Sequence, residues 1–413
     1  MNNIKVNDMK HLLPHITLLQ LVPEPLPTYR ADVTILFGKY LPRFGVQCHI
    51  VGKSGDSEGN NQGFASVQRS YQAVNRKRRE LSYLWLCLKV LWGADKQSCD
   101  LIQVRDMVSI GLLALLIARM KGMPFVYWIS FLMSEERINR ARDNIKTGGG
   151  FRFRLILLKG LFEKHLLYWI ILPNSQHIFV QSEAMKGRLV AQGFSPEKLT
   201  AVPMGVDTET LQLGRIAAQR LPDWEGIPLI AYLGTLDRMR CLHEVIDALI
   251  KVRVQHPDAR LLFIGDSLNS KDTEALLTYA NQVNLNNAVH ITGWLPSNEA
   301  WALLLGADVA ISFVPRSEIY DVSSPTKLLE YLALGMPCVA NDIPDQVQVL
   351  LDSEAGWLTD SSCQGIAQAL TEILDDPKAA RIRSASGPIY IDAHRSYRML
   401  AMKVAEQYRR IIE

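Results

Sequence analysis

The chain has 413 residues, a length that suits two domains of roughly 200 residues better than one hydrophobic core. Its composition is that of a globular protein, and its net charge of only +3 argues against a broad nucleic-acid-binding surface, so we expect no nucleic-acid partner. No uninterrupted apolar run is long enough to span a bilayer, and residues 1–14 lack the apolar core of a signal peptide. The six cysteines form no C-x-x-C pair, which argues against a zinc or disulfide framework and fits a reducing, cytoplasmic compartment.

Short apolar runs in the first half of the chain predict strands that are buried on both faces. These runs are His15–Val22, Val46–Val51, Asp100–Val104, Pro124–Ile129, His177–Gln181 and Lys198–Val202. Helical patterns separate them, and this alternation predicts a parallel sheet. We expect a rigid loop at Pro23–Pro27, a helix capped by Asp32 and ended by Gly45, and a further helix over Arg69–Trp92.

Two helical segments of this half combine basic residues with apolar and aromatic ones. Residues 76–92 begin with the basic run Arg76–Arg79, and residues 151–171 interleave basic and apolar side chains before ending near Trp169. Such helices can lie on an anionic membrane surface. The alternative is that each helix packs its apolar face on the sheet, and the sequence leaves both interpretations open.

The second half repeats the alternation of strands and helices after a linker at Thr208–Ile227. The predicted strands are Pro228–Leu233, Arg260–Ile264, Val289–Thr292, Val309–Phe313, Cys338–Ala340 and Gly356–Leu358. The first of them ends at Gly234, and the following loop holds Arg238 and Arg240. A glycine turn followed by two cations suits a bound diphosphate, although surface arginines are common.

The stretch Ser323–Asn341 reads S-S-P-T-K-L-L-E-Y-L-A-L-G-M-P-C-V-A-N. Its Ser, Pro and Thr residues predict a capped helix start, and Gly335 predicts the helix end. A helix N-terminus favours a bound anion, because its free N–H groups and its dipole both attract negative charge. Glu330 lies one turn into this helix, where a carboxylate can accept hydrogen bonds from sugar hydroxyls. The alternative is an ordinary amphipathic helix with an exposed glutamate.

The whole string S-P-T-K-L-L-E-Y-L-A-L-G-M-P resembles the nucleotide-sugar signature of retaining GT-B glycosyltransferases of family 4. The sequence F-V-Q-S-E-A-M-K, the later V-P-M-G-V-D and the final S-Y-x-x-L-A helix also look like this family. The resemblance implies an α/β fold of the GT-B type, with two Rossmann-like domains facing a central cleft and a C-terminal helix that crosses back to the first domain. It implies an acceptor-side domain at 1–208, joined by 391–413, and a nucleotide-sugar-binding domain at 209–390.

The resemblance also assigns roles to single residues. Arg240, or as a second candidate Arg238, would neutralise the donor phosphates together with Lys327, and Glu330 would bind the ribose. The further residues expected at the donor are Gly234, Ser324, Pro325 and Thr326, with Leu295 beside the base. On the side of the acceptor and the transferred sugar, Ser130 and Glu135 are the candidates.

The implied reaction is a retaining transfer from a nucleotide-diphosphate sugar to a saccharide or lipid-linked acceptor in polysaccharide or cell-envelope biosynthesis. We expect neither a metal nor another cofactor, and we expect a cytoplasmic enzyme that can lie peripherally on the inner face of the cell membrane. Two departures from the family pattern are Val322, where a second glutamate is common, and Ser130, where many members have a histidine. They keep open a GT-B epimerase or phosphorylase, and a catalytically degenerate scaffold that binds a partner transferase.

Overall fold

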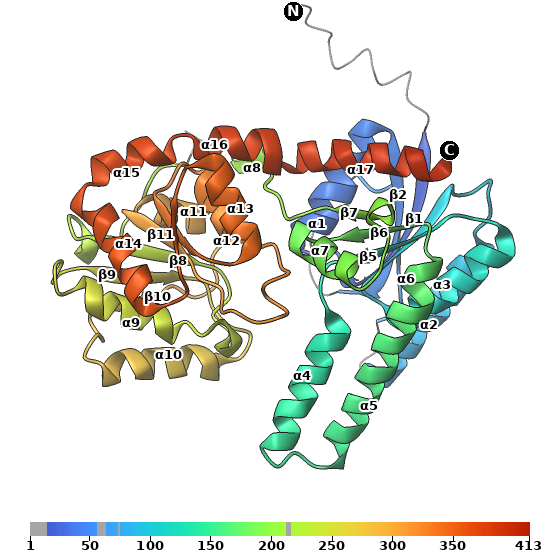
Figure 1. Ribbon diagram of the computed structural model, residues 1–413, viewed down its shortest axis with the longest axis horizontal. Coiled ribbons are helices and arrows are strands. Elements are labelled where there is room, and N and C mark those ends of the chain that lie inside the picture. Colours follow the sequence, from blue (N-terminus) through green and yellow to red (C-terminus); the bar gives the residue numbers. More distant parts are fainter. Residues whose placement is uncertain (1–14, 56–62, 73–74, 212–215) are drawn as a thin grey trace, which may run out of the picture. The chain divides into compact units, whose positions relative to one another are not determined.

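The computed structural model describes residues 15–55, 63–72, 75–211 and 216–413 (Figure 1). The chain forms two compact units. The first comprises the residues up to Pro203 together with Tyr397–Glu413, and the second comprises Met204–Ser396. The segment to which the signal-peptide expectation applies, 1–14, lies outside the described residues.

The first unit is built on a parallel sheet with the strand order β3-β2-β1-β4-β5-β6-β7, seven strands within the described residues. The strands are β1 (Ile16–Leu26), β2 (Val46–Ser54), β3 (Ser66–Arg69), β4 (Leu101–Arg105), β5 (Phe125–Ile129), β6 (His177–Val180) and β7 (Leu199–Ala201). Every residue of β4 and β5 is buried, which explains why the sequence of these strands is continuously apolar apart from Gln103 and Arg105.

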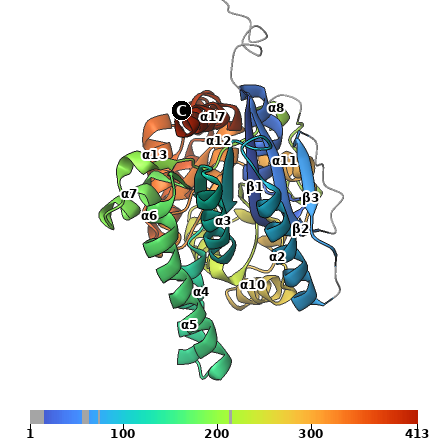
Figure 2. The same cartoon turned by 90° about the vertical axis from the view of Figure 1, so that its right-hand side faces the viewer.

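Helices flank this sheet, and one pair extends away from it. They are α1 (Ala31–Val33), η2 (Thr34–Tyr40), η3 (Leu41–Phe44), α2 (Arg76–Gly93), α3 (Val108–Lys121), α4 (Met133–Lys146), α5 (Phe151–Leu166), η4 (Leu167–Ile171), α6 (Leu172–Asn174), α7 (Glu183–Ala191) and η5 (Pro196–Lys198). The helices α4 and α5 lie side by side and protrude beyond the sheet (Figures 1 and 2). Helix α5 runs through η4 and α6, so the predicted helix at 151–171 is confirmed.

The last helix, α17 (Tyr397–Ile412), belongs to the first unit. Its apolar face, which includes Leu400, Val404 and Tyr408, is part of the core that β1, β2 and η2 share. The Tyr408 hydroxyl donates to the Gln103 side-chain oxygen at 2.6 Å inside this core. The predicted return of the C-terminal helix to the first domain is therefore confirmed.

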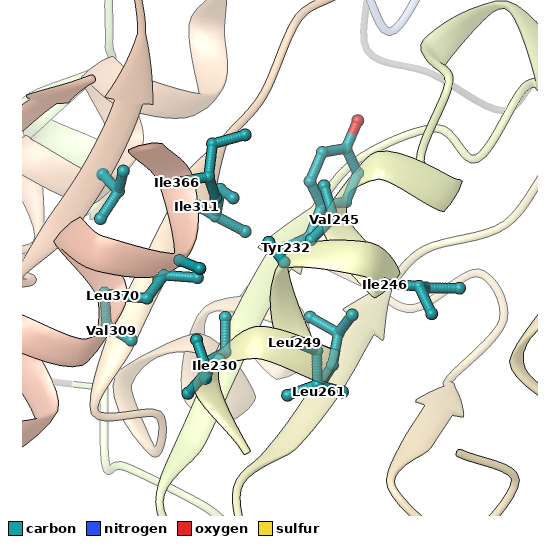
Figure 3. Close-up of a cluster of buried hydrophobic side chains, with 14 of the residues drawn as sticks. Ile230, Tyr232, Val245, Ile246, Leu249, Leu261, Val309, Ile311, Ile366 and Leu370 are labelled. Carbon is teal, nitrogen blue, oxygen red and sulfur yellow. The ribbon is translucent and has the colours of Figure 1, made fainter. Parts of the chain in front are cut away.

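The second unit is built on a parallel sheet with the order β10-β9-β8-β11-β12-β13, six strands in the part of the chain that the structure describes. The strands are β8 (Leu229–Leu233), β9 (Arg260–Ile264), β10 (Val289–Ile291), β11 (Val309–Ser312), β12 (Cys338–Asn341) and β13 (Trp357–Thr359). Ile230, Tyr232 and Ile311 pack against Leu249 and Leu370 in a buried cluster that joins the sheet to two helices (Figure 3).

The helical elements of the second unit connect and cover these strands. They are α8 (Thr208–Leu211), η6 (Pro222–Trp224), η7 (Arg238–Arg240), α9 (His243–Val252), α10 (Ser270–Gln282), α11 (Ser297–Leu305), α12 (Thr326–Ala333), α13 (Pro344–Ser353), α14 (Cys363–Asp375), α15 (Pro377–Ser384), α16 (Gly387–Tyr390) and η8 (Ile391–Arg395). In both sheets the strand order reverses beside the first strand, at β1/β4 and at β8/β11. Ligands bind outside the carboxyl ends of the strands at such a switch point. Both units are Rossmann-like, as predicted.

Three local predictions about the start of the chain are wrong. The expected loop at Pro23–Pro27 is mostly strand, because β1 continues to Leu26 after a register shift against β2. Strand β3 was not predicted, and α2 begins at Arg76 instead of Arg69. Arg30, not Asp32, is the N-cap residue of α1. The Asp32 side chain instead turns inward and pairs with two arginines, a contact between distant segments that local sequence does not reveal.

Candidate functional site

A pocket of about 360 Å³ lies in the second unit at the carboxyl ends of β8 and β9. Two glycine turns form its floor, since Gly234 follows β8 and Gly265 follows β9. Both have left-handed backbone angles, with φ of +141° and +138°. The Gly234 N–H donates to the Ile264 carbonyl at 2.9 Å, and a Cβ atom on Gly265 would lie 2.2 Å from the Gly234 carbonyl oxygen. Only glycine fits this close approach of the two turns, and both turns line the pocket.

Two cationic side chains line this pocket from different elements. Arg240 comes from η7, and its guanidinium lies 5.5 Å from the centre of the Tyr320 ring. Lys327 comes from the first turn of α12, and its Nζ lies 5.1 Å from the centre of the Tyr232 ring. Arg238 is exposed and does not line the pocket. Of the two predicted arginines, the structure therefore brings only Arg240 to Lys327.

The protonation state of Lys327 responds to a bound anion. Burial and the nearby positive charge of Arg240 lower the pKa of Lys327 to about 7, although Glu330 and Asp237 act in the opposite direction. A diphosphate beside Lys327 would favour its charged form. Thr326, the first residue of α12, also lines the pocket, so the positive end of the helix dipole faces the same space.

Glu330 lines the pocket one helical turn beyond Thr326. Burial raises the pKa of its carboxyl group, while a hydrogen bond from Trp301 and the charge of Lys327 lower it. The Trp301 indole N–H donates to Glu330 over 3.5 Å. A half-buried carboxylate with one such long bond retains capacity to accept hydrogen bonds from ligand hydroxyls.

Aromatic and apolar side chains form another wall of this pocket. Leu295, predicted beside the base, lines it together with Trp294 and Trp301. Neither tryptophan was predicted to be part of the site. The sequence could have indicated Trp294, because it directly precedes Leu295 in the loop after β10. It gave no such indication for Trp301, which reaches the pocket from α11.

Ser324 and Pro325 support the start of α12 and do not line the pocket. Pro325 is the N-cap residue, and no side chain caps the helix. The Ser324 hydroxyl accepts from the Met204 N–H at 2.9 Å and donates to Asp345 at 2.7 Å. Asp345 in turn accepts from Arg395 at 2.6 Å. The residues before α12 are therefore held by contacts within their own unit, and the side-chain cap predicted for the start of this helix is not formed.

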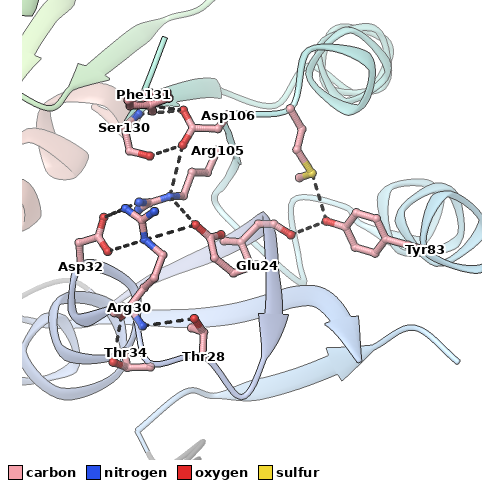
Figure 4. A network of polar contacts seen from close by, with 12 residues as sticks. Glu24, Thr28, Arg30, Asp32, Thr34, Tyr83, Arg105, Asp106, Ser130 and Phe131 are labelled. Atoms are coloured by element: carbon pink, nitrogen blue, oxygen red, sulfur yellow. Dashed lines mark hydrogen bonds and ion pairs between the residues drawn. The ribbon is translucent and has the colours of Figure 1, made fainter. Parts of the chain in front are cut away.

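The predicted acceptor-side residues lie apart within the first unit. Ser130 is buried at the end of β5, where its N–H donates to Asp106 at 2.8 Å and its hydroxyl donates to the same carboxylate (Figure 4). It lines a pocket of about 310 Å³ in that unit. Glu135 does not line this pocket, because it accepts a hydrogen bond from Tyr168 at 2.7 Å and lies 3.8 Å from Lys164.

Three general expectations can be compared with the described residues. All six cysteines are unpaired. No group of three or more His, Cys, Asp or Glu residues in the described ranges is placed to hold a metal ion. Among the helices that the structure describes, none combines the length and the apolar character needed to cross a bilayer. Metal dependence itself stays a prediction.

Comparison with known proteins adds a match for each half of the chain. Residues 32–210 match a family model described as Glycosyltransferase Family 4, and residues 218–387 match one described as Glycosyl transferases group 1. A putative colanic acid biosynthesis glycosyltransferase, WcaL of Salmonella typhimurium, is 27% identical over 212 residues, which are 48% of this chain and 50% of the relative. The chain spans about half of the length of the curated relatives it matches.

Solved structures match nearly the whole chain. A glycosyltransferase from Rickettsia africae has a TM-score of 0.71 at 16% identity, covering 97% of this chain and 100% of the other. Anabaena HepE in complex with UDP has a TM-score of 0.67 at 15% identity, with 96% and 100% covered. These likenesses show the fold, which is of the GT-B type with two Rossmann-like domains.

Proposed function

We propose that this chain, which combines a family 4 and a group 1 glycosyltransferase domain, is a retaining glycosyltransferase that uses a nucleotide-diphosphate sugar. One observation carries the proposal: Arg240, Lys327, the N-terminus of α12 and two open glycine turns converge on one pocket that also contains Glu330. Cations and a helix dipole suit a diphosphate, and a carboxylate one turn away suits a ribose. The name of the Salmonella relative supports a role in polysaccharide biosynthesis, and the acceptor would be a saccharide or a lipid-linked saccharide.

In the proposed mechanism, the protein stabilises the charge that grows on the departing nucleoside diphosphate. Arg240 and Lys327 would bind its phosphate oxygens, and the α12 dipole would add a fixed positive potential. A phosphate oxygen of the leaving group would take the proton of the acceptor hydroxyl, so no protein base is required. The two side-chain cations would supply the neutralisation that a metal supplies elsewhere. We therefore expect transfer to persist in excess EDTA, and a loss that Mg²⁺ restores would contradict this mechanism.

Two substitutions test the proposed site. Glu330→Ala and Arg240→Ala should each abolish or greatly reduce sugar transfer while the melting temperature stays close to that of the wild type. Thermal-shift screening against a panel of nucleotide sugars should first identify the donor, with UDP sugars as the first candidates because the Anabaena structure contains UDP. Wild-type turnover in either variant would contradict the site.

The thermal-shift screen, together with product analysis, separates the competing functions. An epimerase would convert the nucleotide sugar without an acceptor, and a phosphorylase would need inorganic phosphate. A scaffold without catalysis would leave every nucleotide sugar intact, and one without a donor site would give no thermal shift. Product analysis by mass spectrometry, with and without a saccharide acceptor, therefore distinguishes all of them from a transferase.

We also propose that helix α5 lies on an anionic membrane surface. Phe151, Leu155, Leu158, Phe162 and Trp169 recur at helical spacing and are between 51% and 73% exposed. The segment from Met133 to Ile171 has eight Lys and Arg but four Asp and Glu, so its net charge of +4 exceeds that of the whole chain. An apolar stripe with flanking cations is the pattern of an interfacial helix.

Vesicle sedimentation tests this surface. The protein should bind phosphatidylcholine vesicles that contain phosphatidylglycerol and should bind pure phosphatidylcholine much more weakly. Leu158→Glu combined with Phe162→Glu should lower the binding at least tenfold, whereas Ile382→Glu, at an exposed apolar position of α15, should not. Equal binding of the double variant and the wild type would refute the proposal.

A further inference from the structure

A buried network of hydrogen bonds lies beside the start of α12 in the second unit. The Asp345 carboxylate accepts from the Ser324 hydroxyl at 2.7 Å through one oxygen and from Arg395 at 2.6 Å through the other. The Ser324 hydroxyl also accepts from the Met204 N–H at 2.9 Å. Ser324, Asp345 and Arg395 are only 5–8% exposed, so little water competes for these bonds.

The network lies where the chain enters and leaves this unit. Met204 is the first residue of the unit, and Ser396, directly after Arg395, is the last. The Val206 N–H donates to the Arg395 carbonyl at 2.9 Å, and Val206 and Ser396 form a parallel β-bridge. The two terminal segments of the unit are thus bonded to each other and, through Asp345, to the loop that precedes α12.

Helix α12 contributes Thr326, Lys327 and Glu330 to the donor pocket, and its start is not fixed in the usual way. In many helices a side chain at the N-cap accepts from the second or third N–H group of the helix. No side chain does so in α12, and such a cap would occupy N–H groups that suit a bound phosphate. The network instead holds Ser324, two residues before the helix begins. A displaced Ser324 would therefore displace the first turn of α12.

Stability alone does not account for this network. Taking a carboxylate and a guanidinium out of water is costly, and apolar residues of similar volume often replace such a pair without loss of stability. The unit uses apolar packing for the rest of α12, since Leu328 and Leu332 belong to the same buried cluster as Val206 and Ile391. A hydrogen-bonded network differs from such packing because it favours one arrangement of the segments that it joins.

We propose that Asp345 and Arg395 are positioning residues of the donor pocket, and that they hold the start of α12 where the diphosphate of a nucleotide meets it. Neither residue lines the pocket, so both act through Ser324. The ligand named here rests on the function proposed above. Without the network, the first turn of α12 takes up other positions, and Thr326 and Lys327 bind phosphate more weakly.

Hydrogen exchange measured by mass spectrometry on the full chain tests the positioning without a ligand. The variant combines Asp345→Leu with Arg395→Met, which replaces the ion pair by apolar side chains of similar size and should keep the melting temperature close to that of the wild type. The peptide that covers 326–334 should nevertheless exchange at least threefold faster than in the wild type, because Ser324 has lost its acceptor. An unchanged exchange rate of this peptide would overturn the proposal.

Asp308→Asn is the matched control. Asp308 accepts from Arg220 and from the Leu229 N–H, both at 2.8 Å, at the amino ends of β8 and β11, whereas the donor pocket lies at the carboxyl ends of β8 and β9. This substitution weakens a comparable ion pair of the same unit and should lower the melting temperature without changing the exchange of 326–334. An equal increase of that exchange in the control would overturn the proposal, because any loss of stability would then suffice.

Calorimetric titration measures the consequence for the ligand. The double variant should bind UDP and pyrophosphate at least tenfold more weakly, since the displaced groups are those that contact phosphate, and Asp308→Asn should bind both as the wild type does. A loss confined to UDP, or unchanged affinities in the double variant, would overturn the proposal. If the double variant does not fold, Ser324→Ala decides, because it leaves the ion pair intact and removes only its link to α12. It should show the same losses, and unchanged affinities there would overturn the proposal.

The two measurements keep this proposal separate from the proposed function. A wild type that binds neither UDP nor GDP would contradict the proposed function, and the exchange rates would still decide whether the network positions α12. A wild type that binds a nucleotide, with the double variant binding it equally well, would leave the proposed function standing and refute the positioning role.

Discussion

Nucleotide binding should take up a proton at Lys327. The pKa of this lysine is about 7 in the unliganded pocket, because burial and Arg240 disfavour its charged form. A diphosphate favours the charged form, so its pKa in the complex must be higher than in the free protein. Between these two pKa values, binding therefore takes up a proton, and the affinity falls as the pH rises.

The expected magnitude follows from the fraction of the free protein that is already protonated. If the pKa in the complex exceeds about 9, the affinity for UDP should fall roughly 15-fold between pH 7 and pH 8.5, and about 0.75 proton should be taken up at pH 7.5. The terminal phosphate of UDP contributes little in this range, since a phosphate monoester has its second pKa near ~6.

Titration calorimetry in two buffers of different ionisation enthalpy measures both quantities. Lys327→Met keeps a side chain of similar length but cannot be protonated, so its affinity should be lower at pH 7 and nearly independent of pH. Arg238→Met is the matched control, because Arg238 is exposed and outside the pocket, and it should keep the wild-type profile. A change below twofold in the wild type, or an unchanged slope in Lys327→Met, would refute the reasoning.

Three further predictions, which use four substitutions, test the site and the fold. Gly265→Ala should lower the free energy of unfolding by about 3 kcal/mol, because a Cβ atom there would meet the backbone. Gly187→Ala on α7 is the control and should raise the free energy of unfolding by about 0.5–1 kcal/mol, because the space around this position is open. Equal effects of the two substitutions in urea unfolding would contradict this reasoning. Glu330→Gln should lower the affinity for UDP roughly tenfold and leave the affinity for pyrophosphate, which has no ribose, unchanged. An equal loss of affinity for both ligands in calorimetry would contradict a ribose contact. Tyr408→Phe should cost about 1–2 kcal/mol of stability by removing the donor to Gln103, and an unchanged melting temperature would show that this buried bond contributes nothing.

Runs of apolar residues along the chain predicted the strands well. The central strands of both sheets are buried on both faces, so that runs such as Phe125–Ile129 and Leu229–Leu233 stand out as apolar. Gly335 was predicted to end its helix, and its φ of +66° is the left-handed conformation that favours glycine there. The short strand β3 has no buried residue, and so its sequence lacked the apolar run that reveals the others.

Contacts between distant segments account for what the sequence did not reveal. It provided Arg240 as the first candidate and Arg238 as the second, and the turn of η7 brings only Arg240 to the pocket. Ser324 was predicted as part of a capped helix start and as a donor contact; in the structure its hydroxyl donates to Asp345, which lies 21 residues further along the chain. The buried Arg105 forms ion pairs with Glu24 and Asp106, which are 82 positions apart and meet only when β1 and β4 pair.

Arg240 is the cation on which the proposed binding of a nucleoside diphosphate in the second unit depends most. Calorimetric titration of UDP and GDP into the wild type, Arg240→Ala and Arg238→Ala tests this dependence in one experiment. We predict that the wild type binds at least one of the two nucleotides, that Arg240→Ala binds it at least tenfold more weakly, and that Arg238→Ala binds it as the wild type does. Failure of the wild type to bind either nucleotide, or equal affinities of the wild type and Arg240→Ala, would contradict the account.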